Sequence, residues 1–140
     1  MNAFARVQAL QKTAKRKPKG RLEREVQVGV MAYLATRTDV FWWRANTQAG
    51  FAPSGQFMRS GVKGQPDLFC VQAPAGRLIG IELKREKGGR VSPDQERFAA
   101  NLIAHGGVYC VARGTEDVER VLGSVRAHVV RVGGKRVIRR

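Results

Sequence analysis

The chain has 140 residues, of which 43% are hydrophobic, and 26 lysines and arginines against 11 acidic residues give it a formal net charge of +15. This length fits one compact domain. No apolar run is long enough to span a membrane, and the basic N-terminus is not followed by the apolar stretch that a secretory signal needs. Cys70 and Cys110 lie in apolar runs without metal-ligand spacing, so we expect buried thiols and no zinc. The positive charge favours nucleic acid as the partner. Without a membrane span or a signal, we expect the protein in the cytoplasm, or in the nucleus if its host has one.

The positive charge is concentrated at the two ends of the chain. Residues 1–21 contain seven basic residues and no acid, residues 127–140 contain five and no acid, and the remaining 14 basic and 11 acidic residues leave +3 between them. We therefore expect a basic flexible arm at 1–21, a folded domain at 22–126, and a basic tail or small hairpin at 127–140. Such ends can be merely solvated, but their positive sign favours contact with phosphate.

The predicted elements begin with a helix over residues 22–37. Val26, Val30 and Leu34 share one face of it, and acidic residues occupy its first turn, where a helix favours negative charge. The next segments are rich in β-branched and aromatic residues or in turn formers. They predict a strand at 39–46, a long loop at 47–64 whose length suggests a function, and strands at 66–72 and 77–85.

The second helix has a well-marked start. Ser92 suits the N-cap, Pro93 the first helical position, and Gln95 completes a capping box. Its predicted buried face consists of Phe98, Ala99, Leu102 and Ile103. A strand at 107–113 should lie parallel to the preceding strand, because a helix joins the two, and a last helix is expected at 115–126. This order predicts an α/β fold with a central mixed sheet flanked by helices.

The turn between the second and third strands fixes which residues face each other. Pro74 and Gly76 fit a type I turn over residues 73–76. An antiparallel register centred there places Asp67 opposite Glu82, whereas a one-residue bulge would break this pairing. One face of the two strands is then entirely apolar, which suits a core, and it carries Leu68, Cys70, Ile79, Ile81 and Leu83.

The opposite face brings together Asp67, Glu82 and Lys84. Two carboxylates with Cβ atoms roughly 5 Å apart repel each other. A Mg²⁺ or Mn²⁺ ion would remove that conflict, since such ions bind one or two carboxylates, several waters and a substrate phosphate. A single ExK on a strand is common on protein surfaces, but the Pro-Asp that ends 15 residues before Glu82 favours a metal site. A degenerate, non-catalytic copy is the alternative.

Four separated motifs resemble those of one nuclease family. They are "LEREVQ" (22–27), "GQPDL" (64–68), "IELK" (81–84) and "SPDQ" (92–95). In this order they resemble the VRR-NUC branch of the PD-(D/E)XK nucleases over residues 22–113. The resemblance implies a restriction-endonuclease-like αβββαβ core and a Mg²⁺- or Mn²⁺-dependent endonuclease that hydrolyses phosphodiester bonds.

The resemblance also implies roles for individual residues. Lys84 would serve the attacking water, and Gln95 matches the family's helix glutamine near that lysine. The implied metal ligands are Asp67, Glu82, the main-chain carbonyl of Leu83, and Glu23 directly or through water. Two of these residues also suit purely local roles, because Glu23 fits a helix N-terminus and Gln95 fits a capping box.

Small stand-alone members of this family resemble Holliday junction resolvases and act as homodimers. We therefore expect a homodimeric, structure-selective endonuclease of branched DNA such as four-way junctions. The candidate phosphate contacts, which lie near the site in sequence, are Arg44, Arg59, Lys63, Arg85, Lys87 and Arg90. Two alternatives stay open: a sequence-specific restriction-type endonuclease, and a basic nucleic-acid-binding protein with an inactive nuclease fold.

Overall fold

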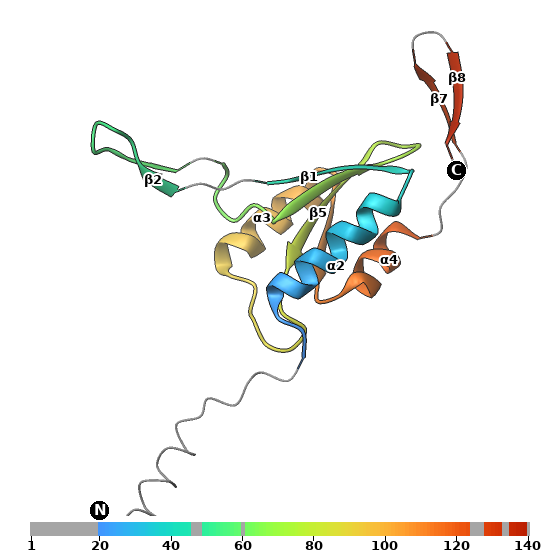
Figure 1. Cartoon of the computed structure of the whole chain (residues 1–140). Helices are drawn as coiled ribbons and strands as arrows, with labels where there is room; N and C mark the ends of the chain where they lie inside the picture. The colour runs from blue at the N-terminus through green and yellow to red at the C-terminus, as the bar shows by residue number, and fades with distance from the viewer. Residues whose placement is uncertain (1–19, 46–48, 60, 124–127, 133–134, 140) are drawn as a thin grey trace, which may run out of the picture.

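The computed structural model describes residues 20–45, 49–59, 61–123, 128–132 and 135–139. All but the last two residues of the predicted arm, 1–21, lie outside this part of the chain. A four-stranded mixed sheet forms the centre of the structure, in the order β1-β4-β5-β6 (Figure 1). Its strands are β1 (Val40–Arg44), β4 (Leu68–Gln72), β5 (Arg77–Leu83) and β6 (Val108–Ala112).

Three helices of the described residues flank this sheet. They are α2 (Glu23–Thr36), α3 (Pro93–Ala104) and α4 (Thr115–Leu122). The predicted α/β architecture, a mixed sheet between helices in the order expected of the αβββαβ core, is confirmed. None of these helices is long and apolar enough to cross a membrane.

The pairing of the central strands follows the predicted register. β4 and β5 are antiparallel, with Leu68 opposite Ile81, and β5 and β6 are parallel. The connection between β4 and β5 is closed by a hydrogen bond from Gly76 N to Gln72 O at 2.9 Å, one residue wider than the bond from Gly76 N to Ala73 O of the expected type I turn. The register is nevertheless correct, since it depends on the centre of the connection and not on its type.

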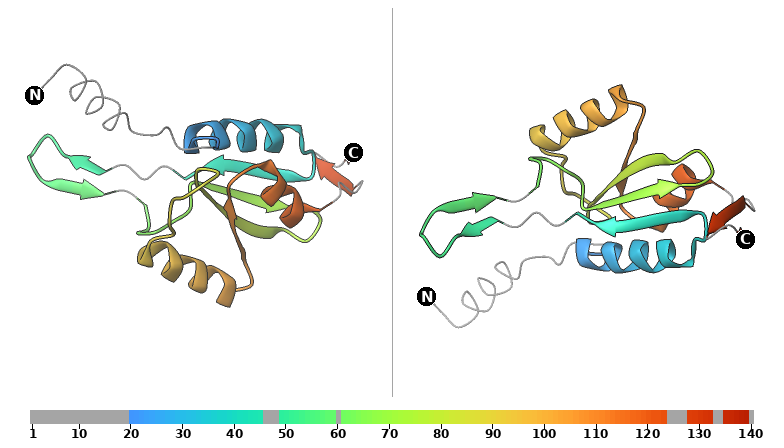
Figure 2. Two further views of the ribbon diagram at one scale, coloured as in Figure 1. Left: turned by 90° about the horizontal axis from the view of Figure 1, so that it is seen from below. Right: turned by 90° about the horizontal axis from the view of Figure 1, so that it is seen from above.

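The helices lie on both faces of the sheet, and the main core lies on one of them. Figure 2 shows α2 and α4 on one face and α3 on the other. The apolar face predicted for β4 and β5 is completely buried and packs with Val26, Val30, Leu34, Val118 and Leu122 of α2 and α4. Cys70 and Cys110 belong to this core as free thiols, and burial raises the pKa of each to about 11. The expected buried thiols are confirmed.

The second face is covered only in part. The capping box of α3 is present, with Ser92 Oγ accepting from Gln95 N at 3.3 Å and Gln95 Oε1 accepting from Ser92 N at 2.9 Å. The prediction of a buried face on α3 was wrong: no residue of the helix is fully buried, and Ile103 is 58% exposed. Among the described residues, a single helix crosses this face of the sheet, so the side chains at the edges of its contact are exposed.

The segment predicted as a long loop contains two short strands. β2 (Ala49–Phe51) and β3 (Phe57–Arg59) form an antiparallel pair that projects beyond the central sheet (Figure 1). Phe51 is 77% exposed, and its ring meets that of Phe57 edge-on at 5.5 Å. The prediction missed these strands because three residues are too few to establish an alternating pattern.

The C-terminal part differs in extent from the prediction. α4 ends at Leu122, followed by Gly123 with φ 67°, and residues 124–127 of the predicted helix lie outside the described residues. β7 (His128–Val132) and β8 (Lys135–Arg139) pair antiparallel within the segment for which a tail or small hairpin was expected.

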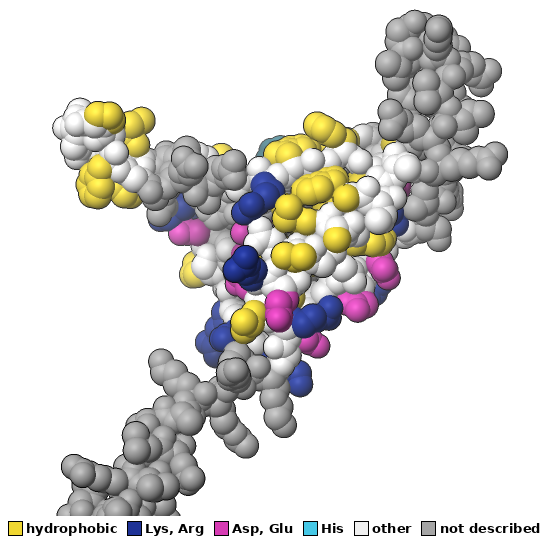
Figure 3. Space-filling model, viewed as in Figure 1, with side chains coloured by type: hydrophobic (Ala, Val, Ile, Leu, Met, Phe, Trp, Pro, Cys, Tyr) yellow, Lys and Arg dark blue, Asp and Glu magenta, His cyan; other side chains and the backbone are white. Residues whose placement is uncertain are grey.

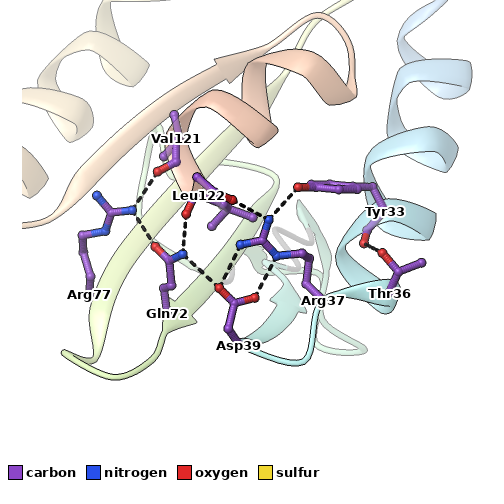
Figure 4. A network of polar contacts seen from close by, with 9 residues as sticks. Tyr33, Thr36, Arg37, Asp39, Gln72, Arg77, Val121 and Leu122 are labelled. Atoms are coloured by element: carbon purple, nitrogen blue, oxygen red, sulfur yellow. Dashed lines mark hydrogen bonds and ion pairs between the residues drawn. The ribbon is translucent and has the colours of Figure 1, made fainter. Parts of the chain in front are cut away.

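A buried polar network joins several elements at the end of the sheet where β1 and β5 begin and β4 ends (Figure 4). Arg37 Nε and Nη2 donate to the two oxygens of Asp39, each at 2.8 Å. Gln72 Nε2 donates to Asp39 Oδ2 at 3.1 Å and to Leu122 O at 2.7 Å. The hydrogen bond from Arg37 is the main reason why the pKa of Asp39 is lowered. The network therefore connects α2, β1, β4 and α4.

Replacing Asp39 by Ala should strongly destabilise the protein, because it leaves the buried guanidinium of Arg37 without its anion. We expect a loss of about 3–5 kcal/mol in the free energy of unfolding, measured with urea at neutral pH. Since the pKa of Asp39 is lowered, its stabilisation is present above the ordinary aspartate pKa of about 4 and is lost as the pH falls below it.

The matched control is Arg120→Ala, which removes an exposed ion pair with Asp117 and should cost less than about 1 kcal/mol. Equal effects of the two substitutions would contradict a stabilising role for the buried network.

Candidate active site

Asp67 lies directly before β4, at the opposite end of the sheet from the polar network. The pairing of β4 with β5 ends at Leu68 opposite Ile81, one residue short of Asp67. The carboxylate of Asp67 still reaches the neighbouring strand, because its Oδ2 accepts a hydrogen bond from Leu83 N at 2.7 Å. Asp67 is therefore held at the end of β5, beside Glu82 and the backbone of Leu83.

Glu82 is a buried carboxylate whose two oxygens have different environments. Glu82 is only 2% exposed. Oε1 accepts hydrogen bonds from Lys84 Nζ, at 2.7 Å, and from Gln95 Nε2. Oε2 is buried and has no hydrogen-bond partner among the described residues. Burial raises the pKa of Glu82, the hydrogen bond from Lys84 lowers it, and the charge of Asp67 raises it further.

Lys84 and Gln95 reach Glu82 from different elements. Lys84 directly follows β5, and its backbone N donates to Ala112 O of β6 at 3.0 Å, which continues the parallel pairing. Gln95 belongs to the first turn of α3. Its Oε1 completes the capping box while its Nε2 donates to Glu82. The capping and site interpretations of Gln95 are therefore compatible, because one side chain makes both contacts.

The first-helix acid lies apart from this group. Glu23 is exposed and lines a hollow of about 520 Å³ together with Gln27 and Arg44. Within the described part of the chain, no three His, Cys, Asp or Glu side chains are placed to hold one metal ion, so Glu23 does not join Asp67 and Glu82 here. Glu25, the other acid of that turn, accepts a hydrogen bond from Leu22 N at 2.8 Å and serves as a helix cap.

The candidate phosphate contacts differ in their surroundings. Arg44, Lys63, Arg85, Lys87 and Arg90 are exposed, and the side chain of Arg59 lies outside the described residues. Lys63 is already 3.4 Å from a carboxylate oxygen of Asp94. Figure 3 shows Lys and Arg side chains along the edge of the domain between the β2–β3 pair and the start of α2, with acidic side chains among them.

Arg113 organises the basic loop that follows β5. Its Nη1 donates to Arg85 O at 2.9 Å and also to Gly88 O, and its Nη2 donates to Gly89 O at 2.9 Å. The loop that carries Arg85, Lys87 and Arg90 is thereby tied to the end of β6. Sequence reasoning missed this role, since a single arginine after a strand gives no signal of its long-range partners.

Comparison with protein families identifies the domain that contains these residues. Residues 51–116 match the VRR-NUC domain, a nuclease domain of the PD-(D/E)XK superfamily. The similarity to the VRR-NUC domain covers residues 51–116, just under half of the chain. The family resemblance of the sequence motifs is thus confirmed, and the match includes Asp67, Glu82, Lys84 and Gln95, whereas Glu23 and Arg44 precede it. Neither a curated protein nor a solved structure matches the chain.

Two glycines explain how the domain places its aspartate. Gly64 has φ +78°, and a Cβ there would collide with the carbonyl group of Asp94 in α3. Gly80 of β5 leaves room for Pro66, whose Cγ lies 2.8 Å from the position of a Cβ on that glycine. The chain before Asp67 is therefore fixed against the start of α3 on one side and against β5 on the other, which sets the position of Asp67 relative to Gln95 and Glu82.

Gly64→Ala should therefore disturb the site, and Gly55→Ala provides a matched control. Both glycines have positive φ, which by itself should cost each substitution about 1–2 kcal/mol of stability. Gly64→Ala should cost more, because only the Cβ at position 64 collides with backbone. We expect Gly55→Ala to retain wild-type nuclease activity and Gly64→Ala to lose at least about 1.4 kcal/mol of transition-state stabilisation, or tenfold in rate. Equal cleavage rates of the two folded variants would show that the contact with α3 does not position the site.

Proposed function

We propose that this VRR-NUC protein is a Mg²⁺- or Mn²⁺-dependent endonuclease that cuts branched DNA, such as four-way junctions, as a homodimer. The main support for this proposal is the environment of the Glu82 carboxylate. It is buried, two donors hold its Oε1, and its Oε2 has no partner among the described residues. A buried carboxylate oxygen in this state is costly unless something outside the protein chain binds it.

The residues around Glu82 fit a hard divalent cation. Asp67, Glu82 and the carbonyl of Leu83 would supply only oxygen ligands, which Mg²⁺ and Mn²⁺ prefer, and two carboxylates leave room for water and a substrate phosphate. The hydrogen bond from Leu83 N fixes Asp67 Oδ2 at the end of β5, next to the backbone of Leu83. When bound, such an ion lowers the pKa of water and neutralises negative charge on the phosphoryl oxygens.

The chain's own side chains would prepare and assist this reaction. Gln95 and Lys84 hold Glu82 through Oε1, so that its other oxygen stays available. The largely buried ammonium of Lys84 would orient the attacking water and stabilise negative charge that develops on it. Glu23, on the first turn of α2, would act through water, because it stands apart from the two central acids.

Basic side chains around the site would bind the DNA backbone. Arg85, Lys87 and Arg90 lie on the loop that Arg113 ties to β6, so their backbone positions are defined before DNA binds. Arg44, Arg59 and Lys63 would contact phosphates on the side of the β2–β3 pair. Contacts of this kind orient DNA without reading its sequence, which suits an enzyme that recognises the shape of a junction.

Exposed aromatic residues support the proposed homodimer. β1 is an edge strand, Phe41 on it is 72% exposed, and its ring lies 5.5 Å from that of Trp43. Large exposed apolar groups next to each other are typical of association surfaces. Two active sites related by a twofold axis would match the symmetry of a four-way junction.

The cleavage prediction concerns Asp67 and Lys84. Wild-type protein with Mg²⁺ or Mn²⁺ should cut four-way junctions faster than linear duplex, flap or single-stranded DNA. Asp67→Ala and Lys84→Ala should each lower the cleavage rate by about 10²-fold or more, because Asp67 would hold the cation that neutralises charge on the phosphate and Lys84 would orient the attacking water. Both variants should still bind junction DNA in a gel-shift assay, and Glu96→Ala, an exposed residue beside Gln95, should cut normally.

Other outcomes of this assay contradict the proposal in distinct ways. Discrete fragments from linear duplex would indicate a sequence-specific restriction-type enzyme. Tight binding to every substrate without cleavage under either metal would indicate a non-catalytic nucleic-acid-binding protein.

The dimer prediction concerns Phe41. Sedimentation equilibrium at micromolar concentration should give a dimer for the wild type and a shift toward monomer for Phe41→Ser, because serine removes exposed apolar area from the contact. Val28→Ser, on the exposed side of α2, is the control and should leave the dimer intact. A monomeric wild type would contradict the homodimer, and an unchanged Phe41→Ser dimer would exclude this surface.

A further inference from the structure

Two buried side-chain polar atoms of the described residues lack a hydrogen-bond partner. They are Glu82 Oε2 and the hydroxyl oxygen of Tyr109. Buried polar atoms in native proteins are almost always paired with protein or with ordered water, because an unpaired one costs free energy. The mechanism proposed above uses Glu82 but gives no role to Tyr109.

Tyr109 and Glu82 lie on the same face of the sheet, on adjacent strands. In the parallel pairing of β5 with β6, Tyr109 is opposite Gly80 and Glu82 is opposite Val111. Paired residues point to the same side of a sheet, and so do residues two apart on one strand. Tyr109 is thus the diagonal neighbour of Glu82, within reach of an aromatic side chain.

Electrostatics also connects the hydroxyl of Tyr109 to the site. Its pKa is raised, mainly by burial and then by the negative charges of Glu82 and Asp67. The phenol therefore stays protonated at neutral pH and can act as a hydrogen-bond donor. Glu82 Oε2 can only accept when the carboxylate is ionised, which is the form that binds a cation, so a donor and an acceptor lie near each other without direct contact.

We propose that Tyr109 is a positioning residue of this site: its hydroxyl donates a hydrogen bond to a water molecule that in turn donates one to Glu82 Oε2. One shared water satisfies both buried atoms. Because Oε2 has two lone pairs, it can accept this hydrogen bond and still bind a cation. Oε1 is held by Lys84 and Gln95, and the water holds Oε2, so the carboxylate is oriented at both oxygens. The metal-binding part of this inference rests on the proposed function.

The test compares Tyr109→Phe with Tyr33→Phe in the full chain. Tyr33 is the other tyrosine of the chain. Its hydroxyl accepts a hydrogen bond from Arg37 Nη1 at 2.8 Å, in the polar network at the other end of the sheet. Titration calorimetry with MnCl₂ alone measures metal affinity, and cleavage kinetics separate kcat from KM. We expect Tyr109→Phe to weaken Mn²⁺ binding about tenfold and to lower kcat by a similar factor with unchanged KM for DNA, since outer hydrogen bonds to a ligating carboxylate typically matter by about 10–100-fold.

Tyr33→Phe should keep wild-type Mn²⁺ affinity and kcat while lowering the thermal midpoint, because it removes a hydrogen bond remote from the site. Wild-type Mn²⁺ affinity in Tyr109→Phe would overturn the positioning role while leaving the proposed function intact. A wild type that binds no Mn²⁺ and cuts no DNA would overturn the proposed function itself.

A high-resolution crystal structure decides the shared water independently of any metal. The wild type should show an oxygen peak within hydrogen-bond distance of both Tyr109 Oη and Glu82 Oε2, and Tyr109→Phe should lose it. A wild-type map without that peak would overturn the inference whatever the calorimetry gives.

Discussion

Burying an ionised carboxylate is costly unless hydrogen bonds or a cation stabilise it. This cost applies to Glu82, because the residue is only 2% exposed. The described residues stabilise only one of the two carboxylate oxygens of Glu82. Lys84 and Gln95 stabilise Oε1, while the nearby charge of Asp67 and the unpaired Oε2 act in the opposite direction. A sheet selected for stability alone would place an apolar residue at this position. The arrangement is understandable if the negative charge is kept available for a ligand, which is the reason for proposing a metal-dependent active site at this end of the domain.

The rest of the fold makes that costly arrangement possible. The face of the sheet under α2 and α4 provides a continuous apolar core, and the Arg37–Asp39–Gln72 network at the other end pairs its buried charges completely. The apolar core and the charge network thus lie on the other face and at the other end of the sheet from Glu82, while local contacts shape the site itself. Gly64 allows the loop to touch α3, and Pro66 fills the space above Gly80, so Asp67 is placed by packing as well as by its hydrogen bond.

Features that depend on local sequence could be predicted, and features that depend on distant contacts could not. The strand register followed from the position of Pro74 and Gly76 and from the apolar face it created, and the capping box followed from the spacing of Ser92 and Gln95. The same reasoning could not find the clamp made by Arg113, because its carbonyl partners lie 24 to 28 residues away. Nor could it find Tyr109, whose relation to Glu82 emerges only once β6 is paired with β5. The β2–β3 strands were missed because they are short, and the burial of α3 was overestimated because periodicity does not reveal how many helices cover a face.

Anomalous diffraction from crystals soaked in MnCl₂ decides whether Glu82 Oε2 and Asp67 share a divalent cation. We expect one strong manganese peak in contact with Asp67, Glu82 Oε2 and the carbonyl oxygen of Leu83. Manganese bound elsewhere, or no peak at millimolar concentration while both carboxylates remain in the positions described, would contradict it.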